Sequence, residues 1–197
     1  DAARMDMRHS MLVGRFNLVA VLNRLGQLEE ARAVGDQLVA DCHAREAAHF
    51  EGNARTYLAE VLMMSGAWDD AEREAARAVE LLAATPAVAA YPTAILSRVL
   101  LAKSEVRRAL ELSKAAVEIS DKLGAGLEES DAMARLTYAE VLRAMGAHDE
   151  ASEAIHRAAD RVRLRASRIT DDIVRARFLS RVWENARVLE LEKEWGS

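Results

Sequence analysis

One ten-residue pattern recurs four times along the chain and limits its fold more than any other feature. In each copy a leucine is followed four positions later by a turn residue, and an alanine comes five positions after the turn. The copies are LNRLGQLEEA at 22–31, LMMSGAWDDA at 62–71, LLAKSEVRRA at 100–109 and LRAMGAHDEA at 142–151. Their turn residues, Gly26, Gly66, Ser104 and Gly146, are separated by 40, 38 and 42 positions. A nearly constant period of this length predicts a repeat protein.

The residues around each turn indicate that every repeat is a pair of antiparallel helices. A valine precedes each repeated leucine and a large residue lies four positions before it, so one helix with an apolar stripe ends at the turn. Glycine adopts the left-handed conformation at a helix end without a steric penalty, and acidic residues favour the start of the next helix. The third repeat has Ser104 at the turn, and Arg107 and Arg108 replace the acids. We therefore expect its hairpin to be the least regular.

These residues resemble the tetratricopeptide repeat, in which a large, a small and a large residue precede a glycine and an alanine five positions apart. The usual unit has a shorter period and ends in a proline that is missing here, so we expect longer helices, like those in the extended repeats of large bacterial regulators. The resemblance implies an all-α fold, a right-handed superhelical solenoid of antiparallel helical hairpins. We predict a single domain, 1–197, with repeats at about 8–48, 49–84, 86–123 and 127–165.

The C-terminal segment lies outside the repeat and is predicted to be a capping helix at about 170–193. It covers the core of the last hairpin through apolar residues with helical spacing. The predicted apolar face consists of Ile173, Val174, Phe178, Leu179, Val182, Leu189 and Leu191. The segment is also similar to the end of repeat arrays attached to large bacterial Ser/Thr kinases and multidomain ATP-dependent regulators, although Trp183 stands where a proline is expected.

Composition and charge exclude several classes of protein. A chain of 197 residues, 51% of them hydrophobic, is sufficient for one folded domain. A net charge of −5 argues against a dedicated nucleic-acid binder. Seven arginines between 161 and 181 make the C-terminal part locally basic. They would suit an anionic partner, but a solvated helix face paired with neighbouring acids is the interpretation we favour.

The sequence predicts a cytoplasmic protein without a membrane segment. The longest uncharged stretch, residues 81–97, contains two prolines and is interpreted as a helix end, a loop and a helix start. The single cysteine, Cys42, excludes an internal disulfide and suits a reducing compartment. Because the chain begins with Asp1, we expect it to be a fragment of a longer protein.

No catalytic or metal-binding motif is present in the sequence. Phosphate-binding loops, kinase catalytic loops, nucleophile elbows and paired-histidine metal helices are all missing. The tightest group, Cys42, His43 and His49, spreads its side chains around a helix. We therefore predict no enzyme activity, no cofactor and no metal.

The first helices of the hairpins are expected to line a concave groove. Its side chains lack the Lys and Asn set with which some members of the resembled family clamp a terminal carboxylate. Tyr57 is the expected anchor for an extended or helical segment, although a groove filled by the chain's own helices is equally consistent with the sequence. The predicted partner-binding residues are Asn17, Arg24, Asn53, Tyr57, Glu60, Met64, Arg98, Thr137, Glu140 and Arg143.

The predicted function is a non-catalytic protein–protein interaction module that binds a peptide or protein segment in this groove, as part of a larger bacterial signalling or regulatory protein. The alternative is assembly. The chain would then either associate with a second copy, as a homodimer, or dock within the parent protein and restrain an attached catalytic domain. The two differ in whether the groove or another apolar surface makes the contact.

Overall fold

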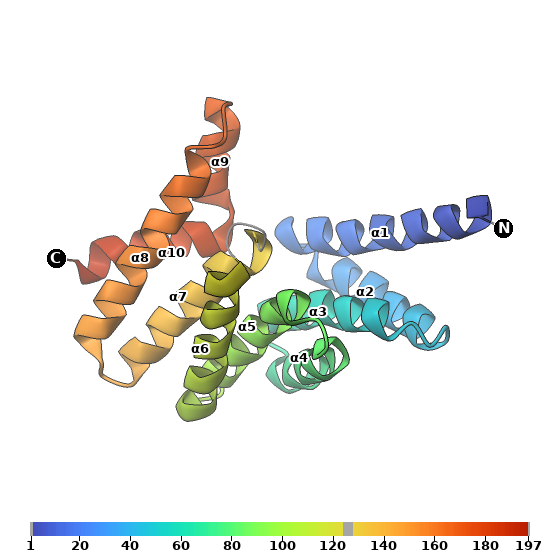
Figure 1. Cartoon of the computed structure of the whole chain (residues 1–197), viewed down its shortest axis with the longest axis horizontal. Helices are drawn as coiled ribbons and strands as arrows, with labels where there is room; N and C mark the ends of the chain where they lie inside the picture. Colours follow the sequence, from blue (N-terminus) through green and yellow to red (C-terminus); the bar gives the residue numbers. More distant parts are fainter. Residues whose placement is uncertain (1, 124–127, 197) are drawn as a thin grey trace.

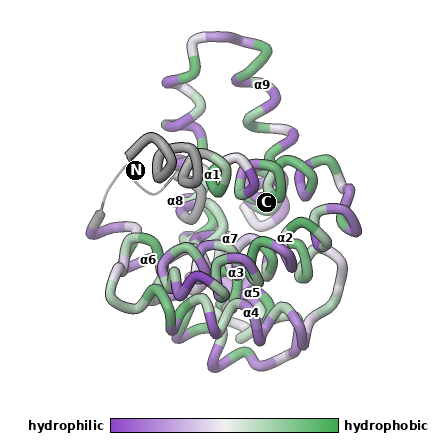
Figure 2. Tube along the Cα trace, turned by 90° about the vertical axis from the view of Figure 1, so that its right-hand side faces the viewer, coloured by the Kyte–Doolittle hydropathy of each residue, from purple (hydrophilic) through white to green (hydrophobic). Residues whose placement is uncertain are grey.

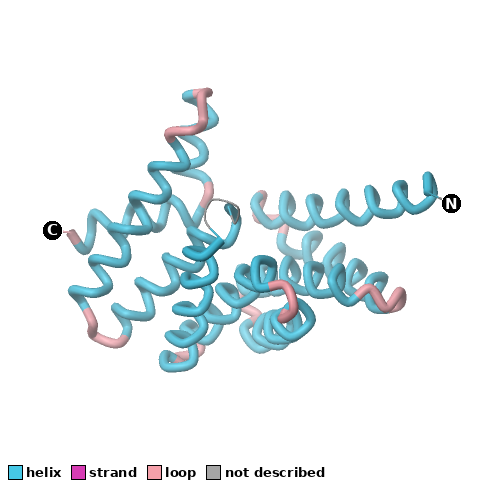
Figure 3. The backbone as a smooth tube through the Cα atoms, viewed as in Figure 1, coloured by secondary structure: helices cyan, strands magenta, loops and turns pink. Residues whose placement is uncertain are grey.

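A computed structural model describes residues 2–123 and 128–196, and within these ranges the chain forms ten α-helices and no strand (Figure 1). Short loops join most successive helices (Figure 3). The helices are α1 (Ala2–Arg24), α2 (Leu28–His43), α3 (Ala48–Met64), α4 (Trp68–Leu82), α5 (Pro86–Ala102), α6 (Val106–Leu123), α7 (Glu128–Ala144), α8 (His148–Ala166), α9 (Asp172–Arg181) and α10 (Trp183–Trp195).

The first eight helices form four hairpins that stack in chain order, which confirms the predicted helical solenoid. In each hairpin the two helices pack against each other, and the second helix also packs against the next hairpin. The first helices α1, α3, α5 and α7 contact one another in sequence. The face that they form is called the inner face.

The repeated small residues explain how closely these helices pack. The alanine five positions after each turn is fully buried in all four repeats. A Cβ atom built on Gly35 would lie 3.1 Å from Leu58 Cδ1, and one built on Gly52 would lie 2.6 Å from Leu82 Cγ. Each of these helix-interior glycines therefore makes room for a leucine of a neighbouring helix.

The expectation that the third hairpin is the least regular is wrong at its turn. Ser104 has φ +64°, close to the +74°, +77° and +82° of Gly26, Gly66 and Gly146. After each of the four turns, the next residue donates its backbone N–H to the carbonyl of the repeated leucine, over 2.8 to 3.0 Å. These bonds satisfy carbonyls at the helix end. The left-handed conformation costs free energy for a serine, and the stacking of the neighbouring helices compensates for this cost.

The predicted capping helix at 170–193 is divided into two helices, and the second of them, α10, caps the last hairpin. Val182 has φ −80° and ψ 107°, an extended conformation that β-branched residues adopt readily. Across this break the Asn185 side chain donates a hydrogen bond to the Phe178 carbonyl, over 3.1 Å. The break lets α10 turn onto α7 and α8, where the first helix of a fifth hairpin would lie.

The predicted apolar face is divided between these two helices. In α10, Leu191 is buried and Leu189 packs against the core of the last hairpin. In α9 no residue is buried, and Ile173 and Val174 are exposed. Helix α9 runs beside the end of α8, and together they form an arm that stands clear of the other helices (Figure 2).

Two further observations bear on the predicted setting of the protein. Cys42 lies buried in the main core with its thiol free, and burial raises its pKa. Among the described helices, none combines the length and apolar character required to span a bilayer.

Candidate functional site

Helix α10 extends from the last hairpin to side chains of the inner face. The guanidinium of Arg98, on α5, lies 4.7 Å from the centroid of the Trp183 ring, and that of Arg143, on α7, lies 5.2 Å from the Trp195 ring. Between these tryptophans, Arg187 lies 3.8 Å from Glu140 of α7. Cation–π contacts therefore hold both ends of α10 against first helices of the hairpins.

Glu184, in the first turn of α10, carries the contact across to α1. Its two carboxylate oxygens accept hydrogen bonds from Nη1 and Nη2 of Arg24, both over 2.9 Å. Glu184 is only 4% exposed, and its hydrogen bonding raises the pKa of Arg24 above its usual range. The pair therefore joins the last helix to the first one through a mostly buried bidentate contact.

Tyr91 of α5 lies beside this pair. Its pKa is raised well above 10.0, first by burial of the phenol and then by the negative charges of Glu60 and Glu184. The Tyr57 ring lies between Tyr91 and Phe16, at centroid distances of 6.4 and 5.9 Å. The expected anchor of a bound segment therefore also packs within the chain itself.

The predicted site residues fall into three groups. Arg24, Arg98, Glu140 and Arg143 contact α10. Glu60 and Thr137 are buried, and Tyr57 and Asn53 are half-buried, with the Asn53 side chain donating to the His49 carbonyl. Asn17 and Met64 are exposed on α1 and α3. The chain thus occupies part of its own predicted groove.

A hollow of about 500 Å³ remains open beside α10, at the turn end of α5 and α7. Arg98 and Glu140 form an ion pair along its wall. Arg143 has no carboxylate partner among the described residues, and its charge faces a largely apolar surrounding. The hollow is lined by Trp68, Arg98, Leu101, Ala102, Glu140, Arg143, Ala144, Arg187 and Trp195.

Sequence reasoning missed the residues that α10 and α4 contribute to this region. Trp68 and Trp195 line the hollow, Trp183 stacks on Arg98, and Glu184 and Arg187 supply the ion pairs. One signal could have indicated the place. The chain has only three tryptophans, and all three gather around this region of the inner face.

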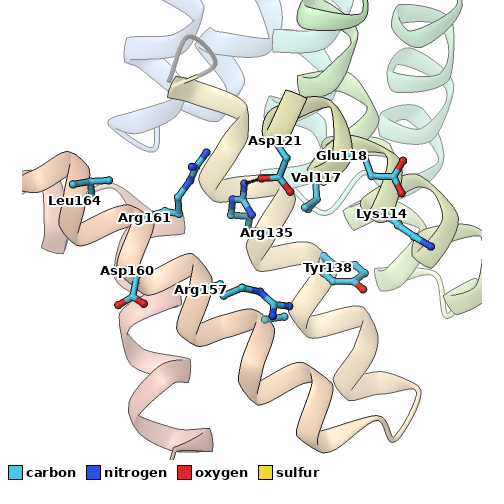
Figure 4. A pocket seen from close by; sticks show the side chains of 11 residues that line it. Lys114, Val117, Glu118, Asp121, Arg135, Tyr138, Arg157, Asp160, Arg161 and Leu164 are labelled. Atoms are coloured by element: carbon cyan, nitrogen blue, oxygen red, sulfur yellow. Dashed lines mark hydrogen bonds and ion pairs between the residues drawn. The ribbon is translucent and has the colours of Figure 1, made fainter. Parts of the chain in front are cut away.

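A second hollow, of about 570 Å³, lies between α6, α7 and α8 (Figure 4). Two of its arginines are paired with acids: Arg135 with Asp121 and Asp131, and Arg161 with Asp131. Farther along α8, Arg163 pairs with Glu192. Of the seven arginines between 161 and 181, Arg161 and Arg163 therefore form ion pairs with neighbouring acids, as expected for a helix face whose charges are paired within the chain.

The histidines whose side chains the structure describes do not converge with the cysteine on one point. Among the described residues, no three His, Cys, Asp or Glu side chains are grouped closely enough to hold a metal ion. His43 Nδ1 lies 3.0 Å from Glu51, and His156 Nδ1 lies 3.3 Å from Glu192.

Comparison with known proteins shows the fold. No family model and no curated protein matches the chain. Two crystal structures of a Podosopora anserina putative kinesin light chain with nearly identical TPR-like repeats, one of them a point variant, are similar to it at 20% identity and a TM-score of 0.64. The likeness covers 94% of both chains for the variant and 95% of both for the other structure. The chain therefore has a tetratricopeptide-like repeat fold.

Proposed function

We propose that this tetratricopeptide-like array is a non-catalytic interaction module that binds a segment of a partner protein at the hollow beside α10. We further propose that it works in the cytoplasm, within a larger bacterial signalling or regulatory protein. The observation that carries the proposal is Arg143, a cation without a carboxylate partner among the described residues, which lies against the Trp195 ring and lines the hollow together with Trp68.

The lining of the hollow suggests the chemistry of the segment. Trp68, Leu101 and Trp195 offer apolar contact area, and Arg143 offers hydrogen bonds to an acceptor. A segment with an acidic residue next to a bulky apolar residue would use both, because a carboxylate pairs well with a guanidinium and an apolar side chain is removed from water.

Helix α10 supports a second candidate, docking within the parent protein. It already occupies part of the inner face through Glu184 and its two tryptophans. A partner that needs the whole inner face would have to displace α10, so the helix could restrain binding or couple it to an attached catalytic domain.

Selection from a library of displayed random peptides tests the first candidate. We expect the selected peptides to be rich in an acidic residue beside an aromatic or aliphatic one, and to change the fluorescence of the tryptophans around the hollow. Arg143→Glu should weaken the binding of these peptides roughly tenfold to a hundredfold, since a hydrogen bond to a charged group contributes about 1.5–3 kcal/mol.

Arg157→Glu is the matched control, because Arg157 is an exposed arginine of the second hollow. Peptides that bind the Arg143→Glu variant normally and lose affinity for the Arg157→Glu variant would move the site to the second hollow. Failure to select any peptide would leave intramolecular docking as the better explanation of the inner face.

A further inference from the structure

The outer side of α1 exposes positions that are buried in the later hairpins. Val21 is 53% exposed, whereas the equivalent Val61, Val99 and Val141 are at most 1% exposed. Leu18 is 44% exposed, whereas its equivalent Leu58 is 3% exposed and packs against Gly35 of the preceding hairpin. The outer side of α1 is thus the same kind of surface that forms the contact between hairpins elsewhere, and here it has no cover.

Gly14 gives a second and independent observation. Of the three glycines inside described helices, Gly35 and Gly52 each receive a leucine from a neighbouring helix, whereas a Cβ atom on Gly14 would meet nothing within 4 Å. A glycine inside a helix lowers stability relative to alanine, and none of the described residues requires one at this position. Close approach of another helix would explain it.

The exposed residues on the outer side of α1 form a stripe that is complementary to the same stripe of a second, antiparallel copy. Leu25 directly follows α1 and continues its hydrogen bonding, is 68% exposed, and is the leucine that could enter the space over Gly14 of a second copy. In the same arrangement Leu18 lies opposite Val21. Both pairings are centred on one point, between Val19 and Ala20, as a two-fold axis requires.

Charge does not oppose this pairing. Residues 11–25 contain two charged side chains, Arg15 and Arg24, which pair with Asp41 and Glu184 of their own chain. Two copies of α1 can therefore meet without bringing unpaired like charges together.

We propose that the outer side of α1, formed by Met11, Gly14, Leu18, Val21 and Leu25, binds the same surface of a second copy of this chain and makes an antiparallel two-fold dimer. The contact is one helix wide, so the dimer is weak and depends on concentration. The proposal does not depend on the function of the inner face, which lies on a different side of α1.

Sedimentation velocity over a range of concentrations tests this dimer. We expect a reversible monomer–dimer equilibrium for the unaltered chain, and at least tenfold weaker dimerisation for Val21→Glu. Because Val21 is exposed, the melting temperature of the Val21→Glu variant should change little. Ile173→Glu, at another exposed apolar position, on α9, is the matched control and should leave the equilibrium unchanged.

Gly14→Gln separates pairing from folding. Gly14 is exposed, a Cβ atom there would meet nothing within 4 Å, and glutamine favours the helix, so the melting temperature should stay the same or rise while the dimer is lost. A chain that remains monomeric at every concentration would overturn the proposal and leave the stripe to a further helical hairpin. A dimer that withstands both Val21→Glu and Gly14→Gln would also overturn it, because the interface would lie elsewhere.

Discussion

Replacing Arg24 with alanine should detach the first turn of α10 from the inner face. Two unit charges about 4 Å apart attract by about 4 kcal/mol at an effective dielectric constant of about 20. The Arg24 side chain is 38% exposed, so solvent screens part of this attraction, but the side chain of Glu184 is only 5% exposed and would keep a buried charge without its partner. We expect Arg24→Ala to lower the free energy of unfolding by about 1.5–3 kcal/mol.

The assay combines chemical denaturation with hydrogen exchange. Amides of residues 183–195 should exchange faster in the variant, while those of α4 should not change. Arg24→Ala and Glu184→Gln should be strongly non-additive in a double-mutant cycle, because each removes the same contact. Additive effects, or a loss below about 0.5 kcal/mol for Arg24→Ala, would show that the Arg24–Glu184 pair does not hold α10 in place. It would then be a surface ion pair that contributes little to stability.

Three further predictions concern the stability of the array. Both Ser104 and Gly66 have positive φ, a conformation that glycine adopts more readily than other residues. Ser104→Gly should therefore stabilise the array by about 0.5–1 kcal/mol in urea denaturation. Gly66→Ala should cost about 1 kcal/mol, and this cost would come from the backbone alone, because a Cβ atom on Gly66 has nothing within 4 Å. Leu62→Ala should cost about 2–4 kcal/mol and Leu142→Ala less, because Leu62 is buried and Leu142 is half-buried; losses below about 1 kcal/mol for both would contradict the stacking of the hairpins. Since folding raises the pKa of Tyr91 above 10.0, its stabilising contribution is complete below pH 10 and is lost as the pH rises beyond it; Tyr91→Phe should weaken the alkaline decline of stability, and an unchanged decline would exclude this cause.

The hairpins could be predicted from the sequence because their determinants are local. Each turn follows from a leucine, a turn residue and an alanine at fixed spacing, and all four turns occur where the pattern places them. Ser104 shows the limit of the residue type alone, because stacking of the neighbouring helices imposes a left-handed conformation that serine rarely adopts.

The C-terminal arrangement could not be predicted in the same way. The break at Val182 involves neither glycine nor proline, so a continuous helix was the reasonable expectation. The pairing of Arg24 with Glu184 is long-range, and helical periodicity carries no information about such a pair. The distance of an inner-face residue from the turn indicates its side of the helix but not what covers it.

The pairing of Arg24 with Glu184 also affects how the chain is made. The two residues are 160 positions apart, so at a synthesis rate of about 5–20 residues per second the partner of Arg24 is added about 10–30 s later. The hairpins can begin to stack during this interval, because their contacts are between neighbours in sequence. The inner face is consequently accessible on the ribosome before α10 exists, and any chaperone or nascent segment that binds it there must leave before the finished chain can close.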